Sequence, residues 1–295
     1  MSRLLKHKEI DFRKYDECII ASSQGTVYAM SWYLDAVFPL WSVCVVGDYD
    51  IVMPVPLKRK FGLKYALQPQ FCQQLGVFSK KTLTSDSVDE MMKSLPFLYC
   101  LNFNHGNIGL IKSKVERPNF VLDLSADYDS LSSGFSYQCR RNIRKASEQK
   151  QRLSAIAKDD YLQFLRGNGS QWTNEAQLNI LSRLIDNALS VGCAELLSVR
   201  NETDEILAAV FFVNWRNRRY YLSPVSSEKG KQWQSMSFLL NKVIEDNSSS
   251  SIVLDFEGSA IAGVQNFYRG FGAVDEPYPL VEKNGWIRRL TVGVR

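Results

Sequence analysis

The chain has 295 residues, of which 45% are hydrophobic and 23% are charged, and its formal net charge is +5. These values are typical of a folded protein in water with one large or two ordinary domains, and no apolar run is long enough for a transmembrane helix. The N-terminus has no signal-peptide core, and the six cysteines are scattered, which favours a cytoplasmic protein. The cysteines have no metal-ligand spacing and there are only two histidines, so we expect no metal and no tightly bound cofactor.

The first half of the sequence alternates between helical and extended patterns. Helix caps such as Thr84, turn residues such as Gly47 and Gly62, and short β-rich runs set the predicted boundaries. The predicted elements, in chain order, are helices at Asp11–Ile20 and Val27–Val37, strands at Trp41–Val46, Tyr49–Lys58 and Leu63–Leu67, a helix opened at Thr84 and running to Ser94, and strands at Phe97–Phe103 and Phe120–Leu124.

The segment Ser136–Arg152 predicts a helix with a strongly basic surface, since it holds six basic residues and one glutamate. Arg140 and Arg144 lie one turn apart. Arg141 and Lys145 do the same, which gives two adjacent basic stripes. Two interpretations stay open: a solvated helix whose arginines pair with carboxylates, or a platform for the phosphates of a CoA, a nucleotide or a tRNA.

The second half repeats the element order of the first: helices, an antiparallel meander, a helix and a strand. The predicted elements are a strand at Arg152–Ala157, helices at Asp160–Leu165 and Asn174–Ser190, strands at Ala194–Arg200, Ile206–Trp215 and Arg219–Pro224, a helix at Gln234–Ile244 and a strand at Ser251–Phe256. A mixed α/β protein with two units, about residues 1–125 and 126–295, is therefore predicted. A single mixed fold of another topology is the alternative.

The stretch Ser251–Ala273 has the pattern of a strand, a turn and a helix. The strand ends on Asp255 and Glu257, and the helix carries Tyr268 and Arg269. Open α/β sheets usually bind their ligand where strands end in loops. Either carboxylate can therefore orient or deprotonate a nucleophile, while Tyr268 can protonate a leaving group and Arg269 can contact the substrate. The alternative is structural: a carboxylate that caps the helix or pairs with Arg269, and a tyrosine that fills the core.

This stretch resembles the closing strand, turn and helix of FemABX-type and other GNAT-like acyltransferases, which often end in a Tyr-Arg/Lys-x-Phe-Gly sequence, here Tyr268–Gly272. The sequence RRNIRKA at Arg140–Ala146 also resembles a basic helix that is common in FemABX proteins. The resemblance implies two tandem GNAT-like units (the acyl-CoA N-acyltransferase fold) and a bacterial acyltransferase. It further implies a CoA thioester or an aminoacyl-tRNA as donor, and a small-molecule, peptide or glycan amine as acceptor.

GNAT enzymes hold the CoA pyrophosphate on a glycine-rich loop, and the corresponding place in this sequence holds Gly230 and Lys231. The neighbouring Trp233, Gln234 and Met236 replace the small residues of that loop. This departure weakens the case for acetyl-CoA and favours the aminoacyl-tRNA donor of the FemABX branch.

Two further segments hold candidate substrate contacts. Trp32 and Tyr33 resemble part of the N-terminal helix that borders the acceptor cleft in the same family, with core packing as the alternative. Gln70 and Gln73 lie in a stretch rich in glutamine and aromatic residues, which can hydrogen-bond and stack a polar ligand. The alternative to an enzyme is a catalytically silent relative that binds an anionic or glycan ligand.

Overall fold

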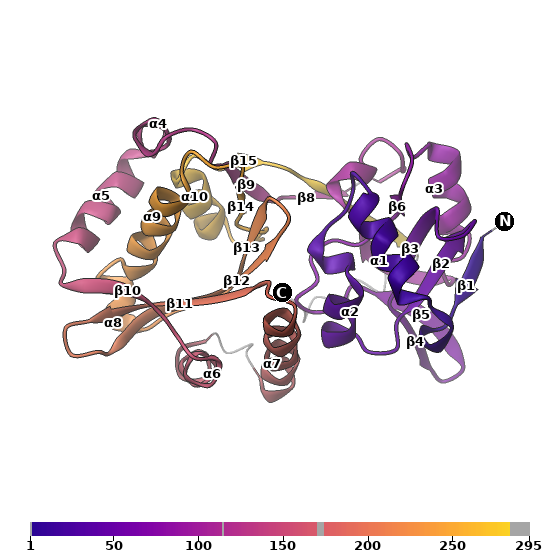
Figure 1. Ribbon diagram of the computed structural model, residues 1–295, viewed down its shortest axis with the longest axis horizontal. Helices are drawn as coiled ribbons and strands as arrows, with labels where there is room; N and C mark the ends of the chain where they lie inside the picture. The colour runs from indigo at the N-terminus through magenta and orange to yellow at the C-terminus, as the bar shows by residue number, and fades with distance from the viewer. Residues whose placement is uncertain (1, 114, 170–173, 284–295) are drawn as a thin grey trace. The chain divides into compact units, whose positions relative to one another are not determined.

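The computed structural model describes residues 2–113, 115–169 and 174–283. Within them the chain forms two compact units (Figure 1). Unit 1 contains the residues up to Pro118 and those from Pro277 onward, whereas unit 2 runs from Asn119 to Glu276.

This division differs from the expected boundary between residues 125 and 126. Strand β9 (Phe120–Asp123) belongs to unit 2, because it pairs with β14 (Val253–Asp255). The chain after Glu276 returns to unit 1, so unit 1 is built from two separate stretches of sequence.

Unit 1 begins with a small antiparallel sheet in the order β1-β2-β3-β6, on which helix α1 packs. Helix α1 starts where the Asp11 side chain accepts the N–H of Lys14 at 3.1 Å. The elements are β1 (Arg3–Leu5), α1 (Phe12–Ala21), α2 (Ser31–Val37), β2 (Ser42–Val46), β3 (Ile51–Val55) and β6 (Phe78–Ser79), with 3-10 turns at His7–Glu9 and Val27–Ala29.

A second sheet of unit 1 is completed by a strand from far along the chain. Its order is β4-β5-β7-β16-β8, and β16 pairs antiparallel with both β7 and β8. Val281 of β16 and Leu101 of β7 are buried in one core with Met91 of α3. The elements are β4 (Leu57–Lys60), β5 (Leu63–Leu67), α3 (Ser85–Met92), β7 (Leu98–Asn102), a 3-10 turn at His105–Asn107, β8 (Val115–Arg117) and β16 (Tyr278–Lys283).

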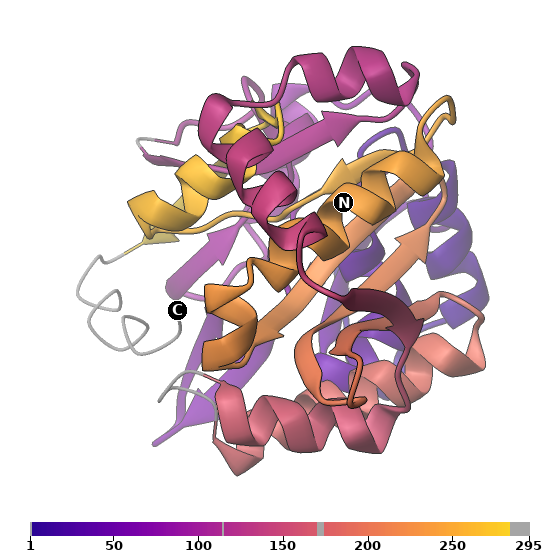
Figure 2. The ribbon, with the colours of Figure 1, turned by 90° about the vertical axis from the view of Figure 1, so that its left-hand side faces the viewer.

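Unit 2 is built on a twisted sheet in the order β10-β11-β12-β13-β14-β9-β15 (Figure 2). Strands β13 and β14 run parallel, and the other neighbours pair antiparallel. Besides β9 and β14, the strands are β10 (Gln151–Ala155), β11 (Ala194–Asn201), β12 (Ile206–Trp215), β13 (Arg218–Ser226) and β15 (Val274–Asp275).

Both faces of β12 are covered, which explains its continuous run of apolar residues. Ala208, Val210 and Phe212 lie in one core with residues of α5, α9 and α10, and the residues between them are buried as well. Helix α6 packs on β12, and α7 packs on β11. The helices of unit 2 are α4 (Tyr128–Ser133), α5 (Tyr137–Ser147), α6 (Lys158–Asn168), α7 (Glu175–Ser190), α8 (Glu228–Gln232), α9 (Ser235–Asn247) and α10 (Ala262–Gly270).

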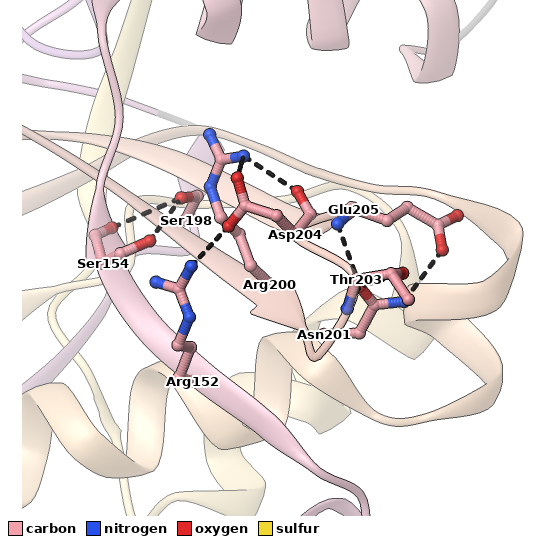
Figure 3. Close-up of polar contacts among 8 residues, drawn as sticks. All are labelled: Arg152, Ser154, Ser198, Arg200, Asn201, Thr203, Asp204 and Glu205. Atoms are coloured by element: carbon pink, nitrogen blue, oxygen red, sulfur yellow. Dashed lines mark hydrogen bonds and ion pairs between the residues drawn. The ribbon is translucent and has the colours of Figure 1, made fainter.

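A network of polar contacts fixes the turn between β11 and β12 (Figure 3). The Asn201 side-chain oxygen accepts the N–H of Glu205 at 2.9 Å. Asp204, whose φ is +64°, pairs with the guanidinium groups of Arg152 and Arg200. Because Arg152 and Asp204 are exposed, their ion pair contributes little to stability, and the main effect of the network is to define the turn.

The predicted elements correspond to observed ones within a few residues, and β12 has the predicted bounds. The predicted strand Tyr49–Lys58 is divided into β3 and β4. The predicted helix Val27–Val37 is divided into a 3-10 turn and α2. Helices α4 and α8 and strands β1, β6, β8, β15 and β16 were not predicted. No helix of the described residues is long and apolar enough to cross a membrane.

Close packing of α8 on β12 leads to the first prediction. A Cβ added at Gly230 would lie 1.9 Å from the Leu207 carbonyl oxygen. We expect Gly230→Ala to lower the free energy of unfolding by roughly 1–3 kcal/mol, because α8 must move away from the strand.

Gly167 of α6 is the matched control, since an added Cβ there meets no atom within 4 Å outside its immediate neighbours. Gly167→Ala should leave the free energy of unfolding unchanged or raise it by up to roughly 1 kcal/mol. Urea unfolding of the two variants checks the prediction, and equal effects would contradict the close packing at Gly230.

Candidate functional site

The ladder between the parallel strands β13 and β14 stops before β13 ends. Its last pair is Tyr220 with Asp255, whereas β13 continues to Ser226. Strand β14 pairs with β9 along its whole length, and the chain stays on β9 beyond Asp255, where the N–H of Phe256 donates to the Phe120 carbonyl oxygen at 2.9 Å. The two strands therefore diverge at this end of the sheet, which is a usual place for a ligand in an open α/β sheet.

Asp255, the first predicted catalytic carboxylate, is buried in an ion pair. Its side chain is 1% exposed, and its Oδ2 lies 2.9 Å from the Nε of Arg218, which also pairs with Glu276. Its Oδ1 accepts the N–H of Glu257 at 2.8 Å. Burial raises the pKa of Asp255, although the Arg218 charge and this hydrogen bond act in the opposite direction. Because both oxygens are already engaged, the structural interpretation describes Asp255, and a catalytic role there stays a prediction that the geometry does not favour.

Glu257, the second predicted carboxylate, lies where the chain leaves the sheet. Its φ is +59°, a backbone conformation that is rare outside glycine and that often marks functional sites. The residue is partly exposed. Of the two predicted carboxylates, Glu257 is therefore the one that remains a candidate catalytic residue.

Tyr268 packs in the core of unit 2. The residue is 7% exposed, and its ring stacks on that of Phe256 with 5.0 Å between centroids. The ring of Tyr221 in β13 is 6.2 Å away, so aromatic side chains of α10, β13 and the end of β14 pack together in one core. Burial raises the pKa of Tyr268, and the charge of Glu257 raises it further. Core packing accounts for Tyr268, and its predicted role as a proton donor gains no support from this burial.

A groove of about 420 Å³ lies between α5 and α10, and we call it the α5–α10 groove. The first turn of α5 is held against the end of α10, because the N–H of Ser136 donates to the Gly270 carbonyl oxygen at 2.8 Å. Side-chain amides and an aromatic ring line the groove, which suits a ligand with many hydrogen-bonding groups. These lining residues are Gln138, Asn142, Asn266 and Phe267.

Sequence reasoning missed the α5–α10 groove, because isolated amide side chains on two helices form no motif. A weak signal was present: Gln138 and Asn142 are one turn apart on α5, and Gln138 Nε2 donates to Asn142 Oδ1 at 2.7 Å. Polar pairs at this spacing are common on exposed helices, so the signal does not identify a site.

The basic side chains of α5 fall into two groups. Arg140 donates to carbonyl oxygens at the end of α4, including that of Ser133 at 3.2 Å, so it is engaged within the fold. Arg141, Arg144 and Lys145 are exposed, and none of them pairs with a carboxylate among the residues that the structure describes. We call these three residues the α5 basic face.

The two basic residues that follow the helix are neutralised. Lys150 lies 3.0 Å from a carboxylate oxygen of Glu202, and Arg152 pairs with Asp204. The interpretation in which basic residues pair with carboxylates therefore applies to Lys150 and Arg152. Anion binding by Arg141 and Arg144 stays a prediction.

Gly230 and Lys231, the predicted phosphate contacts, are engaged within the fold. The N–H of Gly230 donates to Ser227 Oγ at 3.1 Å, and Lys231 pairs with Glu228 at 2.5 Å. The absence of a side chain at Gly230 lets α8 pack against β12. These contacts explain the two residues without a ligand, so phosphate binding there stays a prediction that the geometry does not favour.

Arg269, a predicted substrate contact, is also engaged within unit 2. Its guanidinium group lies 2.9 Å from an oxygen of Asp275 and 4.7 Å from the centroid of the Phe120 ring. This pairing is of the structural kind that the sequence offered as the alternative, although with a different carboxylate.

The other predicted contacts belong to unit 1, where the structure brings two segments together. Tyr33 of α2 is buried, and its hydroxyl donates to the main-chain carbonyl oxygen of Phe71. The Trp32 ring lies 5.5 Å from that of Tyr33. Gln70 and Gln73 are partly exposed beside Phe71. Core packing therefore describes Tyr33, and binding by Trp32 and the glutamines stays a prediction.

Comparison with known proteins identifies the fold. No family model matches the chain, and no curated protein does. The crystal structure of FemX matches with a TM-score of 0.66 at 11% identity, over 97% of this chain and 99% of FemX. The chain has the FemABX and GNAT-like fold.

Two other solved structures agree with this assignment. The C-terminal domain (DUF2156) of a putative lysylphosphatidylglycerol synthetase from Agrobacterium fabrum matches with a TM-score of 0.61 at 11% identity, over 96% of this chain and 95% of that one. A tandem GNAT protein from the clavulanic acid biosynthesis pathway matches with a TM-score of 0.56 at 10% identity, over 96% and 99%. The predicted fold class is confirmed, and at these identities the likeness concerns the fold alone.

The different surroundings of the two carboxylates lead to a second prediction. Asp255→Asn removes one partner of a buried ion pair, so it should lower the free energy of unfolding by roughly 3–5 kcal/mol. Glu257→Gln keeps the shape of a partly exposed side chain and should change this free energy by less than about 1 kcal/mol. Denaturant unfolding followed by circular dichroism measures both, and variants of equal stability would refute the structural role of Asp255.

Proposed function

We propose that the protein is an acyl- or aminoacyltransferase that moves an acyl group from a CoA thioester or an aminoacyl-tRNA to an amine. One observation carries this proposal. In a fold shared with FemX, strands β13 and β14 diverge, and a carboxylate with unusual backbone geometry, Glu257, lies where β14 leaves the sheet.

The reaction needs few protein groups. An unprotonated amine must lie beside the donor carbonyl, and hydrogen-bond donors must stabilise the oxyanion that forms on it. In this proposal Glu257 accepts the proton of the attacking amine. The C–N bond forms as the C–S bond of the thioester or the C–O bond of the aminoacyl ester breaks, and the proton passes to the leaving thiol or hydroxyl. Main-chain N–H groups of β13 beyond Tyr220, on the side that β14 has left, are the candidate donors to the oxyanion.

Cationic side chains are the favoured holders of the donor phosphates. The short helix after β13 does not offer the amide of Gly230, because Ser227 Oγ already accepts its hydrogen. The α5 basic face carries three cations that no carboxylate of the described residues neutralises. This contrast favours a donor whose phosphates bind side chains, such as the acceptor end of a tRNA, over one held by a glycine-rich loop.

The distances in unit 2 suit a long donor. Helix α10 begins shortly after Glu257 and ends against the first turn of α5. Its nine residues span roughly 13 Å. A donor with its acyl group near Glu257 and its phosphates on the α5 basic face would pass along the α5–α10 groove. The acceptor would be a small-molecule, peptide or glycan amine.

One observation favours a second candidate function. Asp255 is held in a buried ion pair, and the rings of Tyr221, Phe256 and Tyr268 pack together in the core beside the end of β14. A catalytically silent protein that binds an anionic or glycan ligand in unit 2 would need neither a base nor an open strand edge.

The two functions differ in their response to a change at Glu257. Glu257→Gln should lower turnover at least about tenfold, equivalent to roughly 1.4 kcal/mol in the barrier, because the side chain can no longer accept a proton. The assay measures CoA release from acyl-CoA, or deacylation of aminoacyl-tRNA, with a panel of amines. Glu228→Gln, at an exposed carboxylate of the same unit, is the control.

Loss of turnover in Glu257→Gln with unchanged donor binding would support the transferase. Ligand binding without any turnover, for both donors and every amine, would favour the silent protein. Turnover that Glu257→Gln leaves intact would show that the carboxylate is not the base.

The α5 basic face gives a fourth prediction. Arg141→Ala with Arg144→Ala should weaken the binding of uncharged tRNA or CoA at least about tenfold at low salt and lower the salt dependence, because two phosphate contacts are lost. The matched control is Lys150→Ala with Arg152→Ala, which removes the same charge from residues that are already paired. Fluorescence titration at several salt concentrations measures the binding of both double variants. An equal loss of affinity in the two would show that binding depends only on net charge.

A further inference from the structure

Strands β4 and β5 of unit 1 form a hairpin with an unusual composition, and we call Leu57–Leu67 the basic hairpin (Figure 1). Its strands and turn carry four exposed cations: Lys58, Arg59, Lys60 and Lys64. None of these four pairs with a carboxylate in the part of the chain that the structure describes. The surrounding sequence, residues 51–85, contains six lysines and arginines and no aspartate or glutamate.

The arrangement of the cations destabilises the basic hairpin. Arg59 and Lys64 lie directly opposite each other across the two strands. Like charges in such a cross-strand pair are destabilising. A partner that supplies negative charge would relieve this repulsion.

The turn of the basic hairpin also contains a residue that is unfavourable for its backbone conformation. Its two residues, Phe61 and Gly62, have φ values of +48° and +78°, the geometry of a type I′ turn. Asparagine or aspartate is the usual residue at the first of these positions, and a bulky aromatic residue is disfavoured there. Phe61 is nevertheless 92% exposed, so its ring contributes little to the core.

Other apolar side chains are exposed near this turn. Leu63, which pairs with Lys60, is 62% exposed. Phe97 is 69% exposed and precedes β7, whose Leu98 pairs with Tyr65 of the basic hairpin. The ammonium group of Lys283 lies 5.2 Å from the Phe97 ring centroid. Segments that lie in a membrane interface combine exposed apolar side chains with lysines and arginines.

We propose that the basic hairpin docks unit 1 on a bilayer that contains anionic lipid. Phe61 and Leu63 insert at the level of the headgroups, and Lys58, Arg59, Lys60 and Lys64 contact lipid phosphates. A lipid surface fits better than a nucleic acid strand, because Leu63 offers no ring for base stacking and Phe61 projects from a turn.

The test uses the full chain and vesicles of phosphatidylcholine with or without phosphatidylglycerol. We expect the protein to sediment with the vesicles that contain phosphatidylglycerol, to remain in solution with phosphatidylcholine alone, and to lose binding as salt increases. Absence of binding to the anionic vesicles would overturn the proposal.

Two substitutions separate binding from folding. Phe61→Asn creates the Asn-Gly pair that a type I′ turn prefers, and Arg59→Glu places opposite charges across the strands. Both should leave the melting temperature unchanged or higher, while each weakens vesicle binding at least about tenfold. Phe61→Trp should retain binding, because it keeps an aromatic ring suited to the interface.

Lys81→Glu is the charge-matched control, since it makes the same change of net charge as Arg59→Glu at an exposed residue outside the basic hairpin. It should reduce vesicle binding far less than Arg59→Glu does. Equal binding by native protein and Phe61→Asn would overturn the proposal. Binding to single-stranded RNA but not to vesicles, with loss of RNA binding in both hairpin variants, would assign this surface to nucleic acid instead.

Discussion

The buried pair of Asp255 and Arg218 determines where β14 leaves the sheet of unit 2. One carboxylate oxygen faces Arg218 on the neighbouring strand, and the other accepts the N–H of Glu257 two residues later. This second contact is the kind of local hydrogen bond by which aspartate shapes a turn. It holds Glu257 in its left-handed backbone conformation, so the candidate catalytic carboxylate depends on the buried one for its position. Arg218 also pairs with Glu276, the last residue of unit 2.

The sequence identified the segment of the candidate site but could not separate its two carboxylates. Alternation along a strand predicts that Asp255 and Glu257 point the same way. That rule holds only while the chain stays extended, and at Glu257 φ is +59°. The buried partner of Asp255 lies 37 residues earlier in the sequence, at Arg218, so no local pattern could reveal it. The contacts of Arg140 were missed for a similar reason, because the carbonyl oxygens that it binds lie at the end of α4 and just after it, and this helix was not predicted.

Elements with strong local signals were predicted well. The 3.6-residue period of α7 and the uninterrupted apolar run of β12 follow from burial. Their hydrophobic patterns are therefore visible in the local sequence. Strand β16 was missed, because it contains Pro279 and pairs with strands more than 150 residues earlier. Because β16 was missed, the last stretch of the chain was assigned to the second half, although it returns to unit 1.

The position of β16 between β7 and β8 affects how the protein is made. Unit 2 is one uninterrupted stretch and can fold as soon as Glu276 has left the ribosome, whereas unit 1 lacks a central strand until the residues of β16 follow. During synthesis the edges of β7 and β8 therefore stay unpaired while the whole of unit 2 is produced. Unpaired strand edges invite association with other chains, so the N-terminal half has its greatest need of chaperone protection during this interval.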